Sequence, residues 1–164
     1  MKRKKQLTLS KLKKTAWKLL SECIRREAQA TAQADGVGFV ACYTCGELHE
    51  WNNGLQAGHA IGGRTGAILL DEEIIRPQCY ACNIPNHGRY DIFTTKLIRE
   101  KAEALSDGNP IYQATLNAGF SPIYRAMEWW ESKLAASRQV RKWTRGELEA
   151  KCEEYRGRLA SLTS

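Results

Sequence analysis

The sequence has no long apolar run that could cross a membrane. None of its apolar stretches approaches the roughly 20 residues that a spanning helix needs, so we expect no membrane partner. The N-terminal "MKRKK" has no apolar segment behind it, which argues against a secretory signal. Internal repeats and low-complexity linkers are also missing. These absences favour a cytoplasmic protein, in which thiols stay reduced and paired cysteines favour metal over disulfide.

Acidic residues are almost missing from the first 26 positions, which hold ten lysines and arginines and one glutamate. The whole chain has a net charge of +7, so the remainder is slightly acidic. A basic arm suits a polyanion, because neutralised phosphates release their counterions. A solubilising tail or a solvated helix face is the alternative. The residues predicted to contact nucleic acid are Lys2, Arg3, Lys4, Lys5, Lys11, Lys13 and Lys14.

Apolar residues recur at helical spacing near both ends of the chain. The first such stripe predicts a helix from Leu12 to about Ala34, with Ser10 as its cap. Another begins at a Thr144–Glu147 capping box, runs to about residue 162, and carries Leu148, Cys152, Tyr155, Leu159 and Leu162 on one face. We expect that face to be intramolecular core, with a homodimer as the alternative. Cys23 and Cys152 lie on the two stripes and are predicted to be packing residues.

The segment between these helices is short, rich in Gly, Asn and Cys, and poor in long apolar runs. "LQAGHAI" (55–61) and "AILL" (67–70) favour two short strands joined by the turn "GGRTG". Helices are predicted again from Asp91 to about Leu105, over 110–119, and from Pro122 with Ile123, Met127, Trp130 and Leu134 in line. The predicted organisation is a basic arm and helix (1–38), a cysteine-bearing centre (39–90) and a helical region (91–164).

Four of the six cysteines form two C-x-x-C pairs separated by 33 residues. Two such pairs in a reducing compartment are typical of a tetrahedral zinc site with four thiolate ligands. The metal would hold together a segment that is too short and too rich in glycine to fold around a core of its own. The predicted ligands of this structural zinc are Cys42, Cys45, Cys79 and Cys82.

The sequence around the cysteine pairs resembles that of the HNH, or His-Me finger, endonucleases. "CYTCG", "QAGH" and "LDEEIIRPQCYACN" are most similar to the NinG/Rap recombination endonucleases of lambdoid phages, and "KWTRGELEAKCEEYRGRL" resembles the helix that closes those proteins. The resemblance covers about residues 14–105 and 142–162 and leaves 106–141 unplaced. It implies an α+β, mainly helical fold, with a zinc-stapled, treble-clef-like ββα-metal centre flanked by N- and C-terminal helices.

The resemblance implies a metal-dependent endonuclease that hydrolyses branched DNA, such as Holliday junctions and D-loops, during recombination in a bacterial host cell. His59 would be the general base, since an unperturbed imidazole is largely neutral at pH 7. Mg²⁺ or Mn²⁺ would offset the charge that develops on the phosphate, with Asn83 and His87 as ligands. Arg64 and Arg89 are candidates to hold the phosphate, or are ordinary surface arginines.

The sequence also departs from the HNH pattern. Gly58 stands where many members have an aspartate that binds the metal, and Ile74 replaces the middle asparagine. The acidic residues Asp71 and Glu72 could complete the metal site or could be turn residues. Two alternatives therefore stay open: a non-catalytic zinc module that binds nucleic acid, and an HNH nuclease with little preference for DNA structure.

Overall fold

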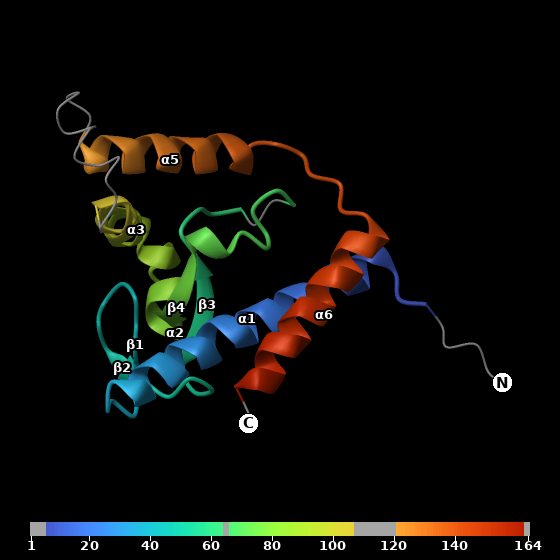
Figure 1. Cartoon of the computed structure of the whole chain (residues 1–164), viewed down its shortest axis with the longest axis horizontal. Coiled ribbons are helices and arrows are strands. Elements are labelled where there is room, and N and C mark those ends of the chain that lie inside the picture. The colour runs from blue at the N-terminus through green and yellow to red at the C-terminus, as the bar shows by residue number, and fades with distance from the viewer. Residues whose placement is uncertain (1–5, 64–65, 107–120, 163–164) are drawn as a thin grey trace.

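The computed structural model describes residues 6–63, 66–106 and 121–162 of the 164-residue chain. As predicted, the fold is α+β and mainly helical, and the described residues contain two small antiparallel sheets (Figure 1). No helix in these ranges is long and apolar enough to cross a bilayer. The predicted helix over 110–119 lies outside the described residues.

The elements are α1 (Leu9–Ala34), β1 (Val40–Ala41), β2 (Leu48–His49), β3 (Leu55–His59), η1 (Glu72–Ile74), β4 (Ile75–Cys79), α2 (Tyr80–Asn83), η2 (His87–Arg89), α3 (Tyr90–Ser106), α5 (Pro122–Ser137) and α6 (Arg145–Ser161).

Helix α1 is longer at its start than the sequence predicted. Its cap is Thr8 rather than Ser10, and the Thr8 hydroxyl accepts a hydrogen bond from the backbone N–H of Lys11. Thr8 has the extended backbone of an N-cap, whereas Ser10 already lies in the first turn. The predicted apolar stripe is confirmed, with Leu12, Ala16, Leu20 and Cys23 buried.

Helix α6 crosses α1, and the two helices bury their apolar stripes against each other (Figure 1). Leu148, Cys152 and Tyr155 are buried, as predicted, in the same core as the α1 stripe. The Cys23 thiol donates to the Tyr155 carbonyl at 3.4 Å, which fixes the register of the pair. The predicted capping box is also present: Glu147 N–H donates to the Thr144 hydroxyl, and Thr144 N–H donates to the Glu147 carboxylate. Both helical cysteines are therefore packing residues.

The central sheet pairs β3 with β4 in antiparallel register, from Leu55 opposite Cys79 to His59 opposite Ile75. The prediction of a strand over 67–70 is wrong, because those residues form turns. Ile68 and Leu70 nevertheless reach the core from the turn, which explains the apolar run. The true partner strand contains Pro77, which cannot donate to a sheet and so weakened the strand signal.

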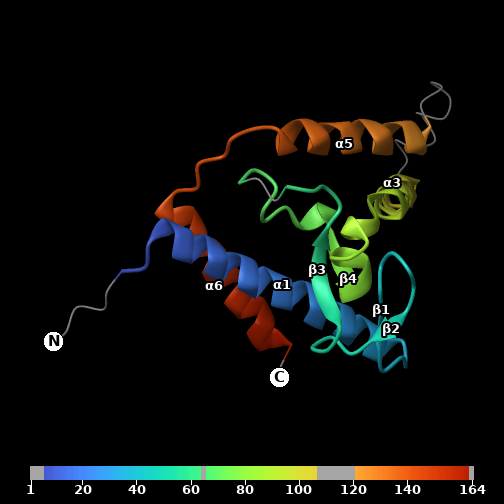
Figure 2. The ribbon, with the colours of Figure 1, turned by 180° about the vertical axis from the view of Figure 1, so that it is seen from behind.

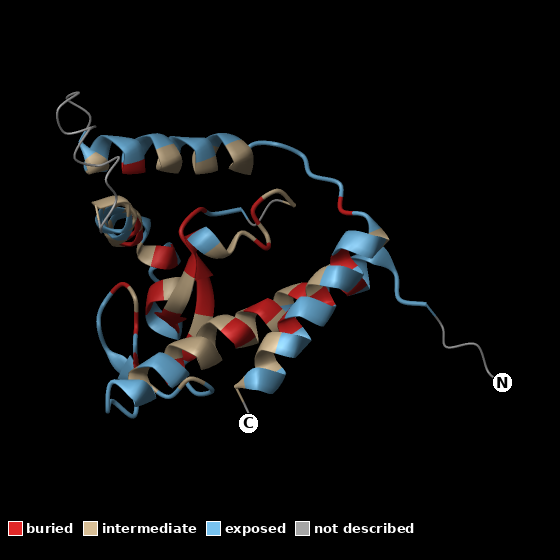
Figure 3. Cartoon of the chain, in the orientation of Figure 1, coloured by how far each residue is buried: buried red, intermediate tan, exposed pale blue. Residues whose placement is uncertain are grey.

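The β3–β4 pair stands between α1 and the α3–α5 pair in both views of the ribbon (Figures 1 and 2). Strand β4 runs directly into α2, so the chain folds as strand, strand and short helix. Buried residues concentrate where this centre meets α1 and α6, whereas the outer surface of α5 is exposed (Figure 3).

Helix α5 turns inward only part of the face that was predicted: Trp130 and Leu134 pack against the core, but Ile123 and Met127 do not. Ala126 is its buried residue, whereas Ile123 and Met127 are 43% and 49% exposed. Trp129 and Trp130 pack against the core, and Lys133 bonds both carboxylate oxygens of Asp71 at 3.1 and 2.8 Å. The Lys133–Asp71 ion pair and the two indoles set the rotation of the helix about its axis. The spacing of apolar residues along the sequence does not reveal these contacts.

Candidate metal centre and histidine site

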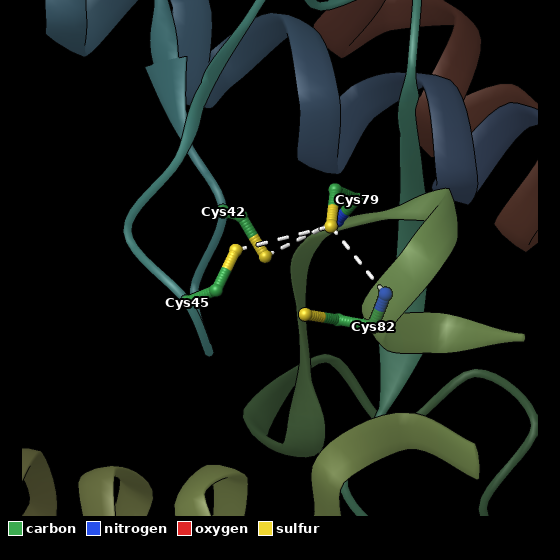
Figure 4. Close-up of side chains that lie close together, drawn as sticks. All are labelled: Cys42, Cys45, Cys79 and Cys82. Carbon is green, nitrogen blue, oxygen red and sulfur yellow. Dashed lines mark hydrogen bonds between the residues drawn. The ribbon is translucent and has the colours of Figure 1, made fainter. Parts of the chain in front are cut away.

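The four predicted zinc ligands converge on one point (Figure 4). Their sulfur atoms all lie within 4.8 Å of one another, and the Cys45 and Cys79 sulfurs are 3.9 Å apart. Four sulfurs placed tetrahedrally about 2.3 Å from a zinc ion would be about 3.8 Å apart. The cluster could therefore hold a structural metal such as zinc. Cys42, Cys79 and Cys82 are buried, whereas Cys45 lies at the surface.

The first cysteine pair sits in a tight turn between β1 and β2. Cys42 N–H donates to the Glu47 carbonyl at 2.8 Å, and Gly46 N–H donates to the Cys42 carbonyl at 2.9 Å. Gly46 has φ +80°, a conformation that glycine adopts at little cost. The turn folds back on itself and presents both sulfurs on one side, as a zinc knuckle requires.

The second pair lies at the junction of β4 and α2. Cys79 caps α2, and its sulfur accepts a hydrogen bond from the Cys82 N–H at 3.4 Å. Cys79 N–H in turn donates to the Cys42 sulfur at 3.2 Å. Burial opposes ionisation of Cys42, but backbone N–H groups of Cys45 and Cys79 outweigh it and lower the pKa of Cys42 to about 6. Burial instead raises the pKa of Cys79 to about 12. The Cys42 sulfur is thus prepared as a thiolate, whereas metal binding would displace the proton of Cys79.

A second group beside the cluster was not anticipated from the sequence. Glu47, His49 and Cys79 place a carboxylate, an imidazole and a sulfur within 4.8 Å of one another, and His49 Nε2 lies 3.6 Å from the Glu47 carboxylate. Imidazoles and carboxylates next to metal ligands commonly orient those ligands. The Glu-x-His spacing directly after the knuckle is the signal that could have identified this group.

His59 is the last residue of β3 and is only 5% exposed. Its ring stacks on Trp17 of α1, with centroids 4.7 Å apart and planes 30° apart. Its Nε2 lies 3.3 Å from the Leu69 carbonyl. A carbonyl can only accept, so Nε2 carries the proton, and in the neutral ring the lone pair is on Nδ1. The surroundings therefore fix both the orientation and the tautomer of this histidine.

Asn83 ends α2 and donates from Nδ2 to Gln56 Oε1 at 2.6 Å. It also borders a hollow of about 390 Å³ between α1 and β3, which we call the α1–β3 hollow. Gln56 and His59 point to opposite faces of β3 because side chains alternate along a strand. Trp17 connects them, since its ring stacks on His59 and also lines the hollow. The lining residues are Trp17, Ser21, Arg25, Leu55, Gln56, Ala57, Asn83 and Ile84.

His87 does not continue the helical turn from Asn83, since α2 ends at Asn83. His87, Gly88 and Arg89 have φ of 49°, 83° and 46°, three left-handed residues in succession. Such a run is costly for residues other than glycine. The Gln78 amide holds it by donating to the Gly88 carbonyl at 2.6 Å. His87 is exposed and Arg89 is half-buried.

The basic residues predicted to bind DNA are only partly described. Lys2, Arg3, Lys4, Lys5 and Arg64 lie outside the described residues. Lys11 and Lys14 are exposed on α1, and Lys13 is half-buried on the same helix.

The described residues do not supply a carboxylate set for a catalytic Mg²⁺ or Mn²⁺. The two acidic candidates are engaged elsewhere: Asp71 pairs with Lys133 at 2.8 Å, and Glu72 pairs with Arg158 at 2.7 Å. Within residues 6–63, 66–106 and 121–162, the two groups containing Cys79 are the only sets of three or more acidic, histidine or cysteine ligands. Asn83 and His87 alone do not form a site of the kind that hard divalent ions usually occupy.

Gly58 has a structural reason to be glycine. A Cβ added there would lie 2.2 Å from Gln78 Oε1 and 3.1 Å from Gln78 Cβ. Gln78 is fully buried, and its Nε2 donates to Thr44 as well as to Gly88, so its amide cannot easily move. An aspartate before His59, as in many HNH enzymes, would need the space that Gln78 fills.

We expect Gly58→Ala to lower the free energy of unfolding by about 1–3 kcal/mol, the usual range for overpacking. The same change should cost less in a Gln78→Ala background, because the clashing amide is gone. Urea denaturation of the zinc-loaded protein and of the three variants gives the coupling energy. Gly38→Ala is the matched control, since a Cβ there meets nothing within 4 Å. Equal costs in both backgrounds would contradict this steric account.

Comparison with protein-family profiles, curated proteins and solved structures gives no match for the chain. Assignments for this site therefore depend on its own residues.

Proposed function

We propose that this protein is a zinc-stapled endonuclease of the HNH type that hydrolyses phosphodiester bonds in branched DNA. The observation that carries the proposal is the local order of the centre. An antiparallel strand pair leads into a short helix, the four cysteines hold this unit to the β1–β2 knuckle, and a histidine of defined tautomer ends the first strand. The resemblance of "QAGH" and "RPQCYACN" to the NinG/Rap endonucleases supports the same function.

His59 is the proposed general base. The proton on Nε2 is directed to the Leu69 carbonyl, and Nδ1 would take the proton of the attacking water. Nδ1 is covered by protein in this structure, so the proposal requires a local opening beside the ring that admits the water. Trp17 keeps the ring from turning, so that the accepting nitrogen stays in one place. A divalent ion would stabilise the negative charge on the phosphate when bound. Asn83 and His87, the ligands expected from the resemblance, do not make a complete site for that ion among the described residues, so we assign no catalytic step to it.

A second candidate is a zinc module that binds nucleic acid without cutting it. The low exposure of His59, 5%, favours this candidate, as does the engagement of Asp71 and Glu72 in ion pairs. Both candidates share the zinc cluster and the basic face of α1, so binding alone does not separate them.

The deciding experiment is a cleavage assay with purified zinc-loaded protein. Labelled four-way junction, fork and linear duplex are each incubated with Mg²⁺, with Mn²⁺, and in buffer that contains no divalent ion. No chelator is added to that buffer, because a chelator would also remove zinc from the cysteine site. We expect junction and fork to be cut in the presence of Mg²⁺ or Mn²⁺ and linear duplex to be cut more slowly. Binding without cleavage under all conditions would favour the non-catalytic module. Equal cleavage of all three DNAs would indicate a nuclease with little preference for structure.

A further inference from the structure

Arg25 lines the α1–β3 hollow and forms no ion pair within 4.0 Å with a described residue, although Glu22 one turn earlier acts on its charge. Its Nη1 donates to the Trp51 carbonyl at 3.1 Å and its Nε donates to the Ser21 carbonyl at 3.0 Å. No carboxylate of the described residues lies within 4.0 Å of its guanidinium nitrogens. Burial lowers the pKa of Arg25, in agreement with a positive charge that is partly removed from water. Its two carbonyl partners orient this charge, and the Glu22 carboxylate, which raises the pKa of Arg25, offsets only part of the effect of burial.

The rest of the hollow is suited to an anion. Its lining residues include no carboxylate, and they add the amides of Gln56 and Asn83, the Ser21 hydroxyl and the Trp17 indole to the charge of Arg25. Amide, hydroxyl and guanidinium donors are the usual partners of phosphate oxygens. The hollow is therefore a cationic, donor-bearing recess.

Helix α1 extends this charge away from the hollow. Lys14, Lys18, Ser21 and Arg25 are spaced by four, three and four residues and so lie along one face of the helix. Lys14 and Lys18 are exposed, and neither forms an ion pair with a described residue. With a rise of about 1.5 Å per residue, the row from Lys14 to Arg25 is about 16 Å long. By contrast, Arg26 next to Arg25 is paired with Glu22 at 3.6 Å.

We propose that the α1–β3 hollow binds a backbone phosphate of DNA, and that Lys14 and Lys18 guide the same strand along α1. The inference rests on the proposed function in taking DNA as the ligand, but it does not require cleavage. It places the strand beside Trp17, the residue that stacks on His59. The row spans several phosphates, since successive phosphates of one strand rise by about 3.4 Å along the duplex.

Gln56→Glu is the sharpest test, because it changes charge and keeps shape. A glutamate oxygen can still accept the hydrogen bond from Asn83, and the new carboxylate faces the same hollow as Arg25. If the hollow binds phosphate, affinity for a labelled junction should fall more than about tenfold. The melting temperature should not fall, since Arg25 gains a potential partner. A structural role alone predicts unchanged affinity.

Removing the cations provides a quantitative second test in salt titrations. Each lost phosphate contact should flatten the slope of log affinity against log salt by about 0.9, so Arg25→Ala should flatten it by about 0.9 and Lys14→Ala/Lys18→Ala by about 1.8. The matched controls are Arg26→Ala, an ion-paired neighbour, and Lys142→Ala, an exposed lysine in the segment before α6. Both should retain the wild-type slope.

Binding is measured without added divalent ions, so that DNA is not cut. Wild-type affinity and slope in Gln56→Glu and Arg25→Ala would overturn the inference, even if the wild-type protein cuts junctions. Binding that depends on Arg25, Lys14 and Lys18 in a protein that never cuts would uphold the inference and refute the endonuclease. A wild-type protein that binds no DNA would overturn both.

Discussion

Withdrawing the metal from the four cysteines is expected to unfold residues 40–90 while α1 and α6 keep much of their helix. The cysteines Cys42, Cys79 and Cys82 form a buried cluster of their own, separate from the main core. The β1–β2 knuckle beside it has only two-residue strands. Zinc binding to small zinc-finger peptides supplies about 10–16 kcal/mol, as much as the whole stability of a typical domain of about 5–15 kcal/mol. Without it, the hydrogen bonds left between the knuckle and β4 are those of Tyr43 N–H with the Pro77 carbonyl, the Gln78 amide with the Thr44 hydroxyl, and Cys79 N–H with the Cys42 sulfur, at 2.9, 3.1 and 3.2 Å.

The measurement uses Cys79→Ser together with wild-type protein treated with chelator. Elemental analysis should find one zinc per wild-type chain and a large loss in the variant. Far-ultraviolet circular dichroism should keep much of its helical signal, whereas hydrogen exchange should show loss of protection over residues 40–90. Cys152→Ala removes a buried thiol outside the cluster and should keep full zinc content. A wild-type protein that stays protected in chelator would refute the structural metal site.

His59→Ala should reduce the cleavage rate by roughly 10²–10⁴-fold, the contribution of one general base. DNA binding and zinc content should stay near wild type, because the residue is assigned to proton transfer. The imidazole is also buried against Trp17, so the truncation leaves a cavity and destabilises the fold. A melting curve for each variant is therefore part of the experiment.

Two further measurements separate chemistry from packing at this position. His59→Gln keeps an amide donor for the Leu69 carbonyl but provides no proton acceptor of suitable basicity, so it should be as inactive as His59→Ala while melting closer to wild type. Added imidazole should restore part of the activity of His59→Ala by occupying the cavity. Wild-type cleavage by a folded His59→Gln protein would show that His59 is not the base.

Local patterns in the sequence predicted the parts of the fold that depend on neighbours along the chain. The C-x-x-C spacing predicted the sulfur cluster, and the stripes through Leu20 and Leu148 predicted the buried faces of α1 and α6. Strand β4 was missed because Pro77 weakens the strand signal and because its pairing with β3 is not local. The inward face of α5 was predicted only at Trp130 and Leu134, because the contact between Lys133 and Asp71, which helps to set its rotation, joins residues 62 positions apart.

The sequence predicted which cysteines of the candidate site come together, but it did not predict the side chains that surround the site. The cysteine ligands and the position of His59 followed from short motifs. The recess around Arg25 did not, because it forms only when α1 is laid along β3. The ion pair between Glu72 and Arg158 likewise joins residues 86 positions apart. The sequence around either residue therefore does not predict it. Charged side chains near a motif thus remain ambiguous until their tertiary partners are known.

The packing of α6 on α1 has a consequence for how the chain folds during synthesis. The Cys23–Tyr155 contact spans 132 residues, and the ion pair of Arg158 with Glu27 closes a similar gap of 131 residues. On the ribosome, the part of the apolar face of α1 that packs on α6 stays uncovered until residues 145–161 have emerged. The zinc knuckle can fold earlier, because all its ligands are made by residue 82. At that stage the nascent chain would combine a folded centre with a partly exposed apolar helix, and such exposed surface favours aggregation.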